Sequence, residues 1–372
     1  MLNISNENFG IRNKYLSEGH FFKLRVEMVS ILRSMKVGGM VGIIAAIVLF
    51  SLAAPVTIHA DSNWQKVAND NGKQNSLSLT LTGQIVSAGE QRWFQSASQN
   101  DALYALFNGQ QVSISSFHYS LNAKVDGLSA EGMLALTFYG SVDGQTVSVT
   151  GGPVVAMIAG ECFPSLSTPS NGACQPSDTS AIPVFFVAAG KITYSGSTIP
   201  VELIVELGFL NPYKAPLVIS TQDGAFVLVS SYDRSQVVWH NVQLAGNLVG
   251  SLGSEAVSGS FVQTTNAIEN FVTGKESESG SIAFTGMSDS ALNGQGRYTG
   301  TSIIPTANEI DCSATITGIP GTCTLTGFNS SGSFIIQAEQ STITGKYNVT
   351  WSVPAVAFTG SISAMVAEHN GD

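Results

Sequence analysis

The stretch LSLTLTGQIV, residues 77–86, alternates between leucine and small hydroxyl side chains. Three leucines at every second position face one side of an extended chain, and the Ser and Thr residues between them face the other. This period of two is typical of a β-strand with one buried face and one face in water. The segment therefore predicts a strand that lies at the surface of a β-sheet protein.

The same alternation recurs along the chain, in FHYSLNAKV (117–125) and in VELIVEL (201–207). Short turn signals separate such segments: Asp126-Gly127, Asp143-Gly144, Asn171-Gly172, Asp223-Gly224 and Asn293-Gly294. Pairs of this kind favour tight hairpins, which join antiparallel strands. We predict an all-β, antiparallel protein, either sandwich-like or an extended sheet system. Residues 90–107 are the best candidate for a helix.

The composition excludes some classes of partner. The 372 residues carry a net charge of −10 and only 11% are charged, while 44% are apolar. From Asp61 onward, 10 Lys plus Arg stand against 23 Asp plus Glu. Binding to nucleic acid requires clustered positive charge, so nucleic acid is not an expected partner. The apolar content is high enough for a folded core.

The N-terminal region predicts export. Basic residues are scattered over 1–36, a cytoplasmic leader or a misassigned start, and no charge follows between 37 and 58. Residues 37–60 fit a cleaved signal peptide, and the apolar run also matches the ~20 residues of a retained membrane anchor. Either alternative places the protein outside the cytoplasm, secreted or held at the cell surface through residues 37–58.

The four cysteines lie in two similar loops, GECFPSLSTPSNGACQ (160–175) and IDCSATITGIPGTCT (310–324). In an exported protein they predict two local disulfides, Cys162–Cys174 and Cys312–Cys323. Their spacing differs from that of zinc ligands, so no metal is expected. The loops recur about 150 residues apart, which indicates two related lobes, 61–250 and 251–372, with chance similarity as the alternative.

No common catalytic or cofactor-binding motif is present, and no cofactor is expected. Glu202 and Glu206 are the only candidate pair of catalytic carboxylates that we single out, because glycoside hydrolysis requires two acids that act together. Four residues of strand separate them by ~13 Å, so either would need an acid from another strand. Two solvated charges on an exposed face are the favoured interpretation.

The leading functional expectation is a non-catalytic exported surface protein, structural or binding, with envelope components or neutral polysaccharide as partners. The alternatives are a secreted polysaccharide hydrolase and a carrier of an apolar ligand. Asn329 and Asn348 begin glycosylation sequons, which agree with an exported surface. The four tryptophans are more consistent with core filling than with a carbohydrate platform.

Overall fold

The computed structural model describes residues 74–166, 172–207, 217–303, 328–352 and 357–368, with the backbone of short strands between 310 and 325. These residues belong to one compact unit, Asn71–Asp372. Its strands are antiparallel throughout, which confirms the predicted all-β class. None of the helices in the described segments has both the length and the apolar character that a membrane crossing demands.

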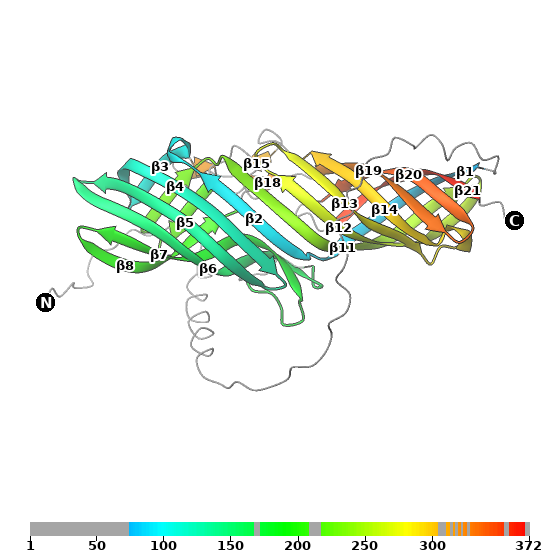
Figure 1. The fold of residues 1–372 in the computed structure, drawn as a ribbon, viewed down its shortest axis with the longest axis horizontal. Helices are drawn as coiled ribbons and strands as arrows, with labels where there is room; N and C mark the ends of the chain where they lie inside the picture. The colour runs from blue at the N-terminus through cyan, green and yellow to red at the C-terminus, as the bar shows by residue number, and fades with distance from the viewer. Residues whose placement is uncertain are drawn as a thin grey trace, which may run out of the picture. The chain divides into compact units, whose positions relative to one another are not determined.

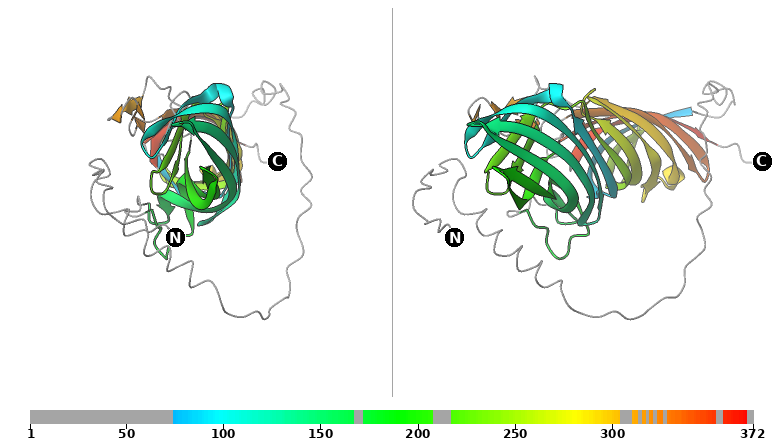
Figure 2. Two further views of the ribbon diagram at one scale, coloured as in Figure 1. Left: turned by 90° about the vertical axis from the view of Figure 1, so that its left-hand side faces the viewer. Right: turned by 60° about the vertical axis from the view of Figure 1, so that its left-hand side comes forward.

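A first circuit of paired strands closes on itself, and we call it the first barrel. Each strand pairs with the next in sequence from β3 to β10, and β10 pairs back with β3. Figure 1 shows β4 to β8 side by side, and the left view of Figure 2 shows cyan to green strands curving around one axis. The strands are β3 (Ala102–Phe107), β4 (Gln110–Asp126), β5 (Ser129–Val142), β6 (Gln145–Phe163), β7 (Ser180–Tyr194), β8 (Ser197–Glu206), β9 (Leu217–Thr221) and β10 (Phe226–Ser230).

A second circuit, the second barrel, closes between the first and last long strands. Strand β1 pairs with β11 on one side and with β21 on the other. The remaining neighbours follow chain order. The strands are β1 (Gln74–Ser87), β11 (Arg234–Leu252), β12 (Glu255–Asn270), β13 (Lys275–Thr285), β14 (Gly294–Ile303), β19 (Phe328–Ala338), β20 (Ser341–Trp351) and β21 (Ala357–Glu368).

One strand pairs with strands of both barrels. Strand β2 (Glu90–Ala97) pairs with β4 of the first barrel and with β11 of the second. Short elements complete the described structure: η2 (Gln99–Asp101), η3 (Ser290–Leu292), β15 (Ile310–Cys312), β16 (Thr315–Ile316), β17 (Ile319–Pro320) and β18 (Cys323–Leu325). The sheet is therefore continuous from one barrel into the other.

Each barrel encloses its own apolar core. In β4 the predicted alternation is confirmed: Phe117, Tyr119 and Leu121 are buried, and His118 lies on the exposed face. The leucines of β1 are buried in the same way in the second core. Trp239 packs against both cores and makes an edge contact with the buried Trp93, whose ring centroid lies 6.0 Å away.

The predicted helix over 90–107 is wrong. This segment forms β2, the short η2 and β3. Trp93, Gln95 and Ala97 alternate into the interior, as in a strand. The Asp101 carboxylate accepts a hydrogen bond from the backbone N–H of Ser98 at 2.6 Å, which stabilises the turn. The irregular apolar spacing therefore reflects two strands with a turn between them.

The predicted sandwich-like layering is not confirmed, because the strand pairings close into circuits. The lobes predicted as 61–250 and 251–372 remain a prediction, and the strand pairings do not follow a single division of the chain. Strand β1 lies before position 250 and β11 spans it, and both contribute to the second barrel. Closure depends on pairing between strands at opposite ends of the chain, for which the sequence carries no local signal.

Most predicted hairpin turns have the backbone geometry that tight turns require. Asp143 and Gly144 both have positive φ, 51° and 75°, where β5 turns into β6. Two adjacent residues with positive φ are typical of the hairpin turn that suits strand twist. Asn293-Gly294 is the exception, because Asn293 follows η3 with a φ of −70° and Gly294 begins β14.

Candidate functional site

Two neighbouring rows of outward-facing side chains cross the second barrel, and we call them together the hydroxyl belt. They come from consecutive strands, because each strand pair is in register at these positions. Serine and threonine make up most of both rows. One row is Asn266, Ser279, Thr299, Ser333, Lys346, Ser363 and Ser78, and the other is Ile268, Ser277, Thr301, Ser331, Asn348, Ser361 and Thr80.

The belt is hollowed over β14, β19 and β20. A shallow depression of about 500 Å³ is open to solvent there. Its polar lining side chains are Thr299, Thr301, Ser331, Ser333, Lys346 and Asn348, and all of them are exposed apart from the half-buried Ser333. The lining therefore offers hydroxyl and amide groups with one cationic side chain.

The barrel wall beneath this depression carries no side chain at two positions, Gly300 and Gly332. Gly300 and Gly332 lie directly opposite each other in the β14–β19 pair. A Cβ added to Gly300 would come within 1.9 Å of the Tyr347 hydroxyl, and one on Gly332 within 2.6 Å of the same ring. The two glycines therefore make room for Tyr347, which packs against the inner side of the wall.

Below the wall, the interior of the second barrel contains acidic side chains. The Tyr347 hydroxyl donates a hydrogen bond to Glu278 at 2.5 Å. Glu276 precedes Glu278 by two residues on the same strand face, and Glu269 of β12 lies directly opposite Glu276. We call Glu269, Glu276 and Glu278 the inner carboxyl cluster.

Burial raises the pKa of each carboxyl group in this cluster. The pKa of Glu269 rises to about 7, and the Trp239 side chain partly opposes the rise. Burial also raises the pKa of Glu276 well above its usual value, and the charges of Glu269 and Glu278 add to the effect. For Glu278, burial raises the pKa and the Tyr347 hydrogen bond lowers it. Glu278 is buried and Glu269 and Glu276 are half-buried, and each pKa shift favours the neutral carboxyl form relative to an exposed glutamate.

The cavity that reaches this cluster, as the described residues line it, is too small for a substrate. It extends to Glu278 with a volume of only about 30 Å³, and its lining is mainly apolar, with Gln263 and Tyr347. Such a volume has room for about one or two water molecules. The inner carboxyl cluster consequently does not resemble the cleft of a polysaccharide hydrolase.

The predicted candidates Glu202 and Glu206 lie elsewhere, on β8 of the first barrel. Glu202 is exposed and Glu206 half-buried, and their register partners on β7 are Ala189 and Phe185. The structure therefore sets no acid opposite either residue on that strand. The three clustered acids were missed from the sequence, although KESESGS (275–281) places Glu276 and Glu278 on one face.

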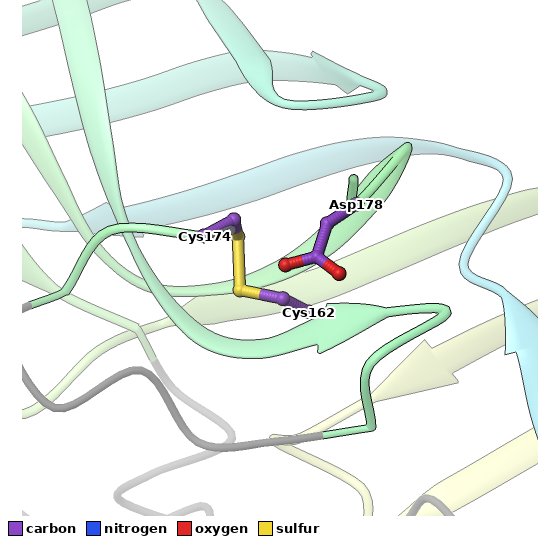
Figure 3. Close-up of side chains that lie close together, drawn as sticks. All are labelled: Cys162, Cys174 and Asp178. Carbon is purple, nitrogen blue, oxygen red and sulfur yellow. A yellow bond between two sulfur atoms is a disulfide. The ribbon is translucent and has the colours of Figure 1, made fainter. Parts of the chain in front are cut away.

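The first predicted disulfide is confirmed. Cys162 at the end of β6 is bonded to Cys174 in the loop before β7, with Cα atoms 5.6 Å apart (Figure 3). The second pair is set opposite by the backbone pairing of β15 with β18. The side chains of Cys312 and Cys323 lie outside the described residues, so their bond remains a prediction.

Asp178 lies beside the disulfide, as Figure 3 shows. Its carboxylate accepts hydrogen bonds from the backbone N–H groups of Ser165 and Gln175, at 3.2 and 2.6 Å. Both sulfur atoms are in the disulfide and the carboxylate binds backbone, so this group stabilises the loop. It gives no reason to revise the expectation that no metal binds.

The predicted sequons and tryptophans can also be placed. Asn329 and Asn348 are exposed on β19 and β20, and Asn329 accepts a hydrogen bond from Thr350. Glycosylation at either position remains a prediction. Trp93 is fully buried, in agreement with core filling. Trp64 lies outside the described residues, as do residues 1–60 with the predicted signal segment.

Comparison with known proteins assigns no family. No family model and no curated protein sequence matches the chain. Among solved structures, two mutants of Rh. blastica porin align with 80% of this chain and 99% of theirs, at 11% and 10% identity. Their TM-scores are both 0.13, too low to support an argument about fold or function.

Proposed function

We propose that this protein is an exported, non-catalytic surface protein that binds a neutral polysaccharide through its hydroxyl belt. The observation that carries the proposal is the depression over β14, β19 and β20, with its polar and nearly uncharged lining. Export itself rests on the sequence of residues 37–60, and the first disulfide is consistent with it.

The chemistry of the belt suits a polymer of repeated hydroxyl groups. A Ser or Thr hydroxyl both donates and accepts hydrogen bonds, so it can pair with a sugar hydroxyl in either direction. Short side chains lose little rotamer entropy on binding. Neighbouring strands repeat the groups every ~4.8 Å, so a long polymer would make many weak contacts at once.

The two alternative functions receive less support. A polysaccharide hydrolase needs two accessible acids, and Glu202 and Glu206 have no acid opposite them on β7. A carrier of an apolar ligand needs a sizeable dry cavity, and the cavity in the second core measures only about 30 Å³. We therefore retain the binding function as the proposal.

The proposal can be tested with the full-length protein and a panel of insoluble neutral polysaccharides. Depletion of protein from solution measures binding, and release of soluble sugar measures hydrolysis. We expect depletion without sugar release. A variant with Ser331→Glu and Ser333→Glu should lose most of the binding, because two carboxylates would have to give up their hydration in the depression.

The matched control carries Thr137→Glu and Ser141→Glu on the exposed face of β5, outside the belt. It should bind as the wild type does. Equal loss in both double variants would show that added negative charge, and not the belt, controls binding. Sugar release by the wild type that is lost in a Glu202→Gln or Glu206→Gln variant would favour the hydrolase instead.

A further inference from the structure

The inner carboxyl cluster places three acids on one wall of the second barrel. Glu269 and Glu276 are direct register partners, so their Cβ atoms are ~5 Å apart. Glu278 follows Glu276 on the same face at ~7 Å along the strand. Two ionised carboxylates at such distances in an interior repel strongly, and binding of a proton by one of them removes the repulsion.

No positive charge faces this cluster within the described residues. The ion pairs of the described chain involve only Glu90, Arg92, Lys124 and Asp126, all outside the second barrel. The groups that interact with the acids from the surrounding strands are neutral: Trp239 of β11, Tyr298 and Ser302 of β14, and Tyr347 of β20. Their own hydrogen-bond partners are neutral too: Thr265 for Tyr298, and Ser330 with Trp351 for Ser302. The two tyrosines are the only titratable groups among them.

The polar atoms around the cluster add an independent observation. One carboxylate oxygen of Glu276, Oε2, is buried without a hydrogen-bond partner. The Ser302 hydroxyl shares a hydrogen bond with Ser330, which accepts one from the indole N–H of Trp351 at 2.9 Å. A hydrogen bond from Ser302 lowers the pKa of Glu276, but burial raises it by more. An ionised Glu276 would leave a buried negative charge under-solvated, which is more costly than a neutral carboxyl group there.

We propose that the inner carboxyl cluster makes the second barrel a proton-dependent structure, most stable in an acidic medium and loosened as the pH rises through neutrality. The outer surface is compatible with an acidic medium, because most side chains of the hydroxyl belt are Ser and Thr. Their hydroxyl groups do not titrate at acidic or neutral pH. The function in polysaccharide binding is not needed for this inference.

The direction of the pH dependence follows from the folded pKa values. Each acid binds its proton more tightly in the folded state than in the unfolded chain, where a Glu pKa is ~4.3. The stability that depends on this cluster is therefore fully present below about pH 4. It declines as the pH rises toward the pKa of the folded state, which is about 7 for Glu269. Glu276 contributes in the same direction, because burial and the charges of Glu269 and Glu278 raise its pKa.

The test is denaturant unfolding of the full-length protein between pH 4 and pH 8. We expect the unfolding equilibrium constant to increase by about 100-fold or more over this range, because proton affinity changes tenfold for every step of one in pKa. Glu276→Gln, which mimics a neutral carboxyl group, should flatten the profile and stabilise the protein at pH 8. The matched control is Glu255→Gln at the exposed start of the same β12 strand that carries Glu269, and it should keep the wild-type profile.

Infrared spectroscopy of the wild type gives a readout that does not depend on folding of a variant. At pH 6 we expect the carbonyl band of a protonated, buried carboxyl group, which disappears on titration above the folded pKa. The proposal is overturned if the wild type is equally stable or more stable at pH 8 than at pH 4. It is also overturned if no protonated carboxyl band is present at pH 6.

Discussion

At the scale of single residues, the position of the Tyr347 side chain requires a glycine at residue 300. A Cβ on Gly300 would meet the Tyr347 hydroxyl at 1.9 Å and a Glu278 oxygen at 2.5 Å. We predict that Gly300→Ala destabilises the protein by about 1–3 kcal/mol, as overpacking does in other cores. Urea unfolding at pH 5 would measure it.

The Tyr347→Phe background provides the control for this prediction. Removal of the hydroxyl should itself cost about 1–3 kcal/mol, because a buried Glu278 oxygen loses its donor. Gly300→Ala should then cost less than it does in the wild type. An equal cost in both backgrounds would mean that the clash with the tyrosine hydroxyl is not the reason for the glycine.

The inner carboxyl cluster also shows the limit of sequence reasoning at this scale. Glu202 and Glu206 were singled out as two acids on one face of a clearly alternating strand, VELIVEL, whereas Glu276 and Glu278 alternate with serines. In KESESGS both faces of the strand are polar, so its period of two does not tell which face lies inside. Only the pairing with β12 and β14 turns the glutamates inward.

At the scale of elements, the loop between β6 and β7 depends on its disulfide and on Asp178. The two cysteines are 12 positions apart in the sequence. Reduction, or a Cys162→Ala and Cys174→Ala double variant, should cost roughly 3 kcal/mol through the added entropy of the unfolded chain. The shift of the denaturant midpoint would measure it.

Peptide mapping without reducing agent supplies the covalent check for both loops. We expect one cross-linked peptide joining Cys162 with Cys174 and another joining Cys312 with Cys323. A peptide that links Cys162 with Cys312 would contradict the two local bonds. An unchanged midpoint on reduction would instead show that Asp178 and the backbone pairing hold the first loop without the covalent bond.

Most elements could be predicted from local patterns, and their mutual arrangement could not. Alternation identified the strands that contain Leu77, Phe117 and Val201, since burial of every second side chain is a local property. The segment 90–107 was predicted as a helix because two strands and a turn broke its alternation. Pairing of β1 with β21 joins residues nearly 300 positions apart, and no local pattern encodes that contact.

At the scale of the whole molecule, two apolar cores share one side chain. Trp239 contacts both cores, and its neighbour Trp93 stacks on Phe271 with centroids 6.2 Å apart. Strand β2 adds backbone hydrogen bonds across the same region. We infer that unfolding of one barrel is coupled to unfolding of the other through these contacts, so the wild type should unfold in a single transition.

Trp239→Ala should lower the stability of the protein and also weaken the coupling between the unfolding of the two barrels. Loss of a large aromatic side chain costs about 3–5 kcal/mol in a core, and here the loss falls between two cores. We therefore expect calorimetry to resolve two transitions in place of one. Trp351→Ala is the matched control, because Trp351 packs only against the second core, and it should lower the melting temperature of a transition that stays single. If Trp239→Ala also kept one transition, the continuous sheet of β2, β4 and β11 would be sufficient to couple the barrels.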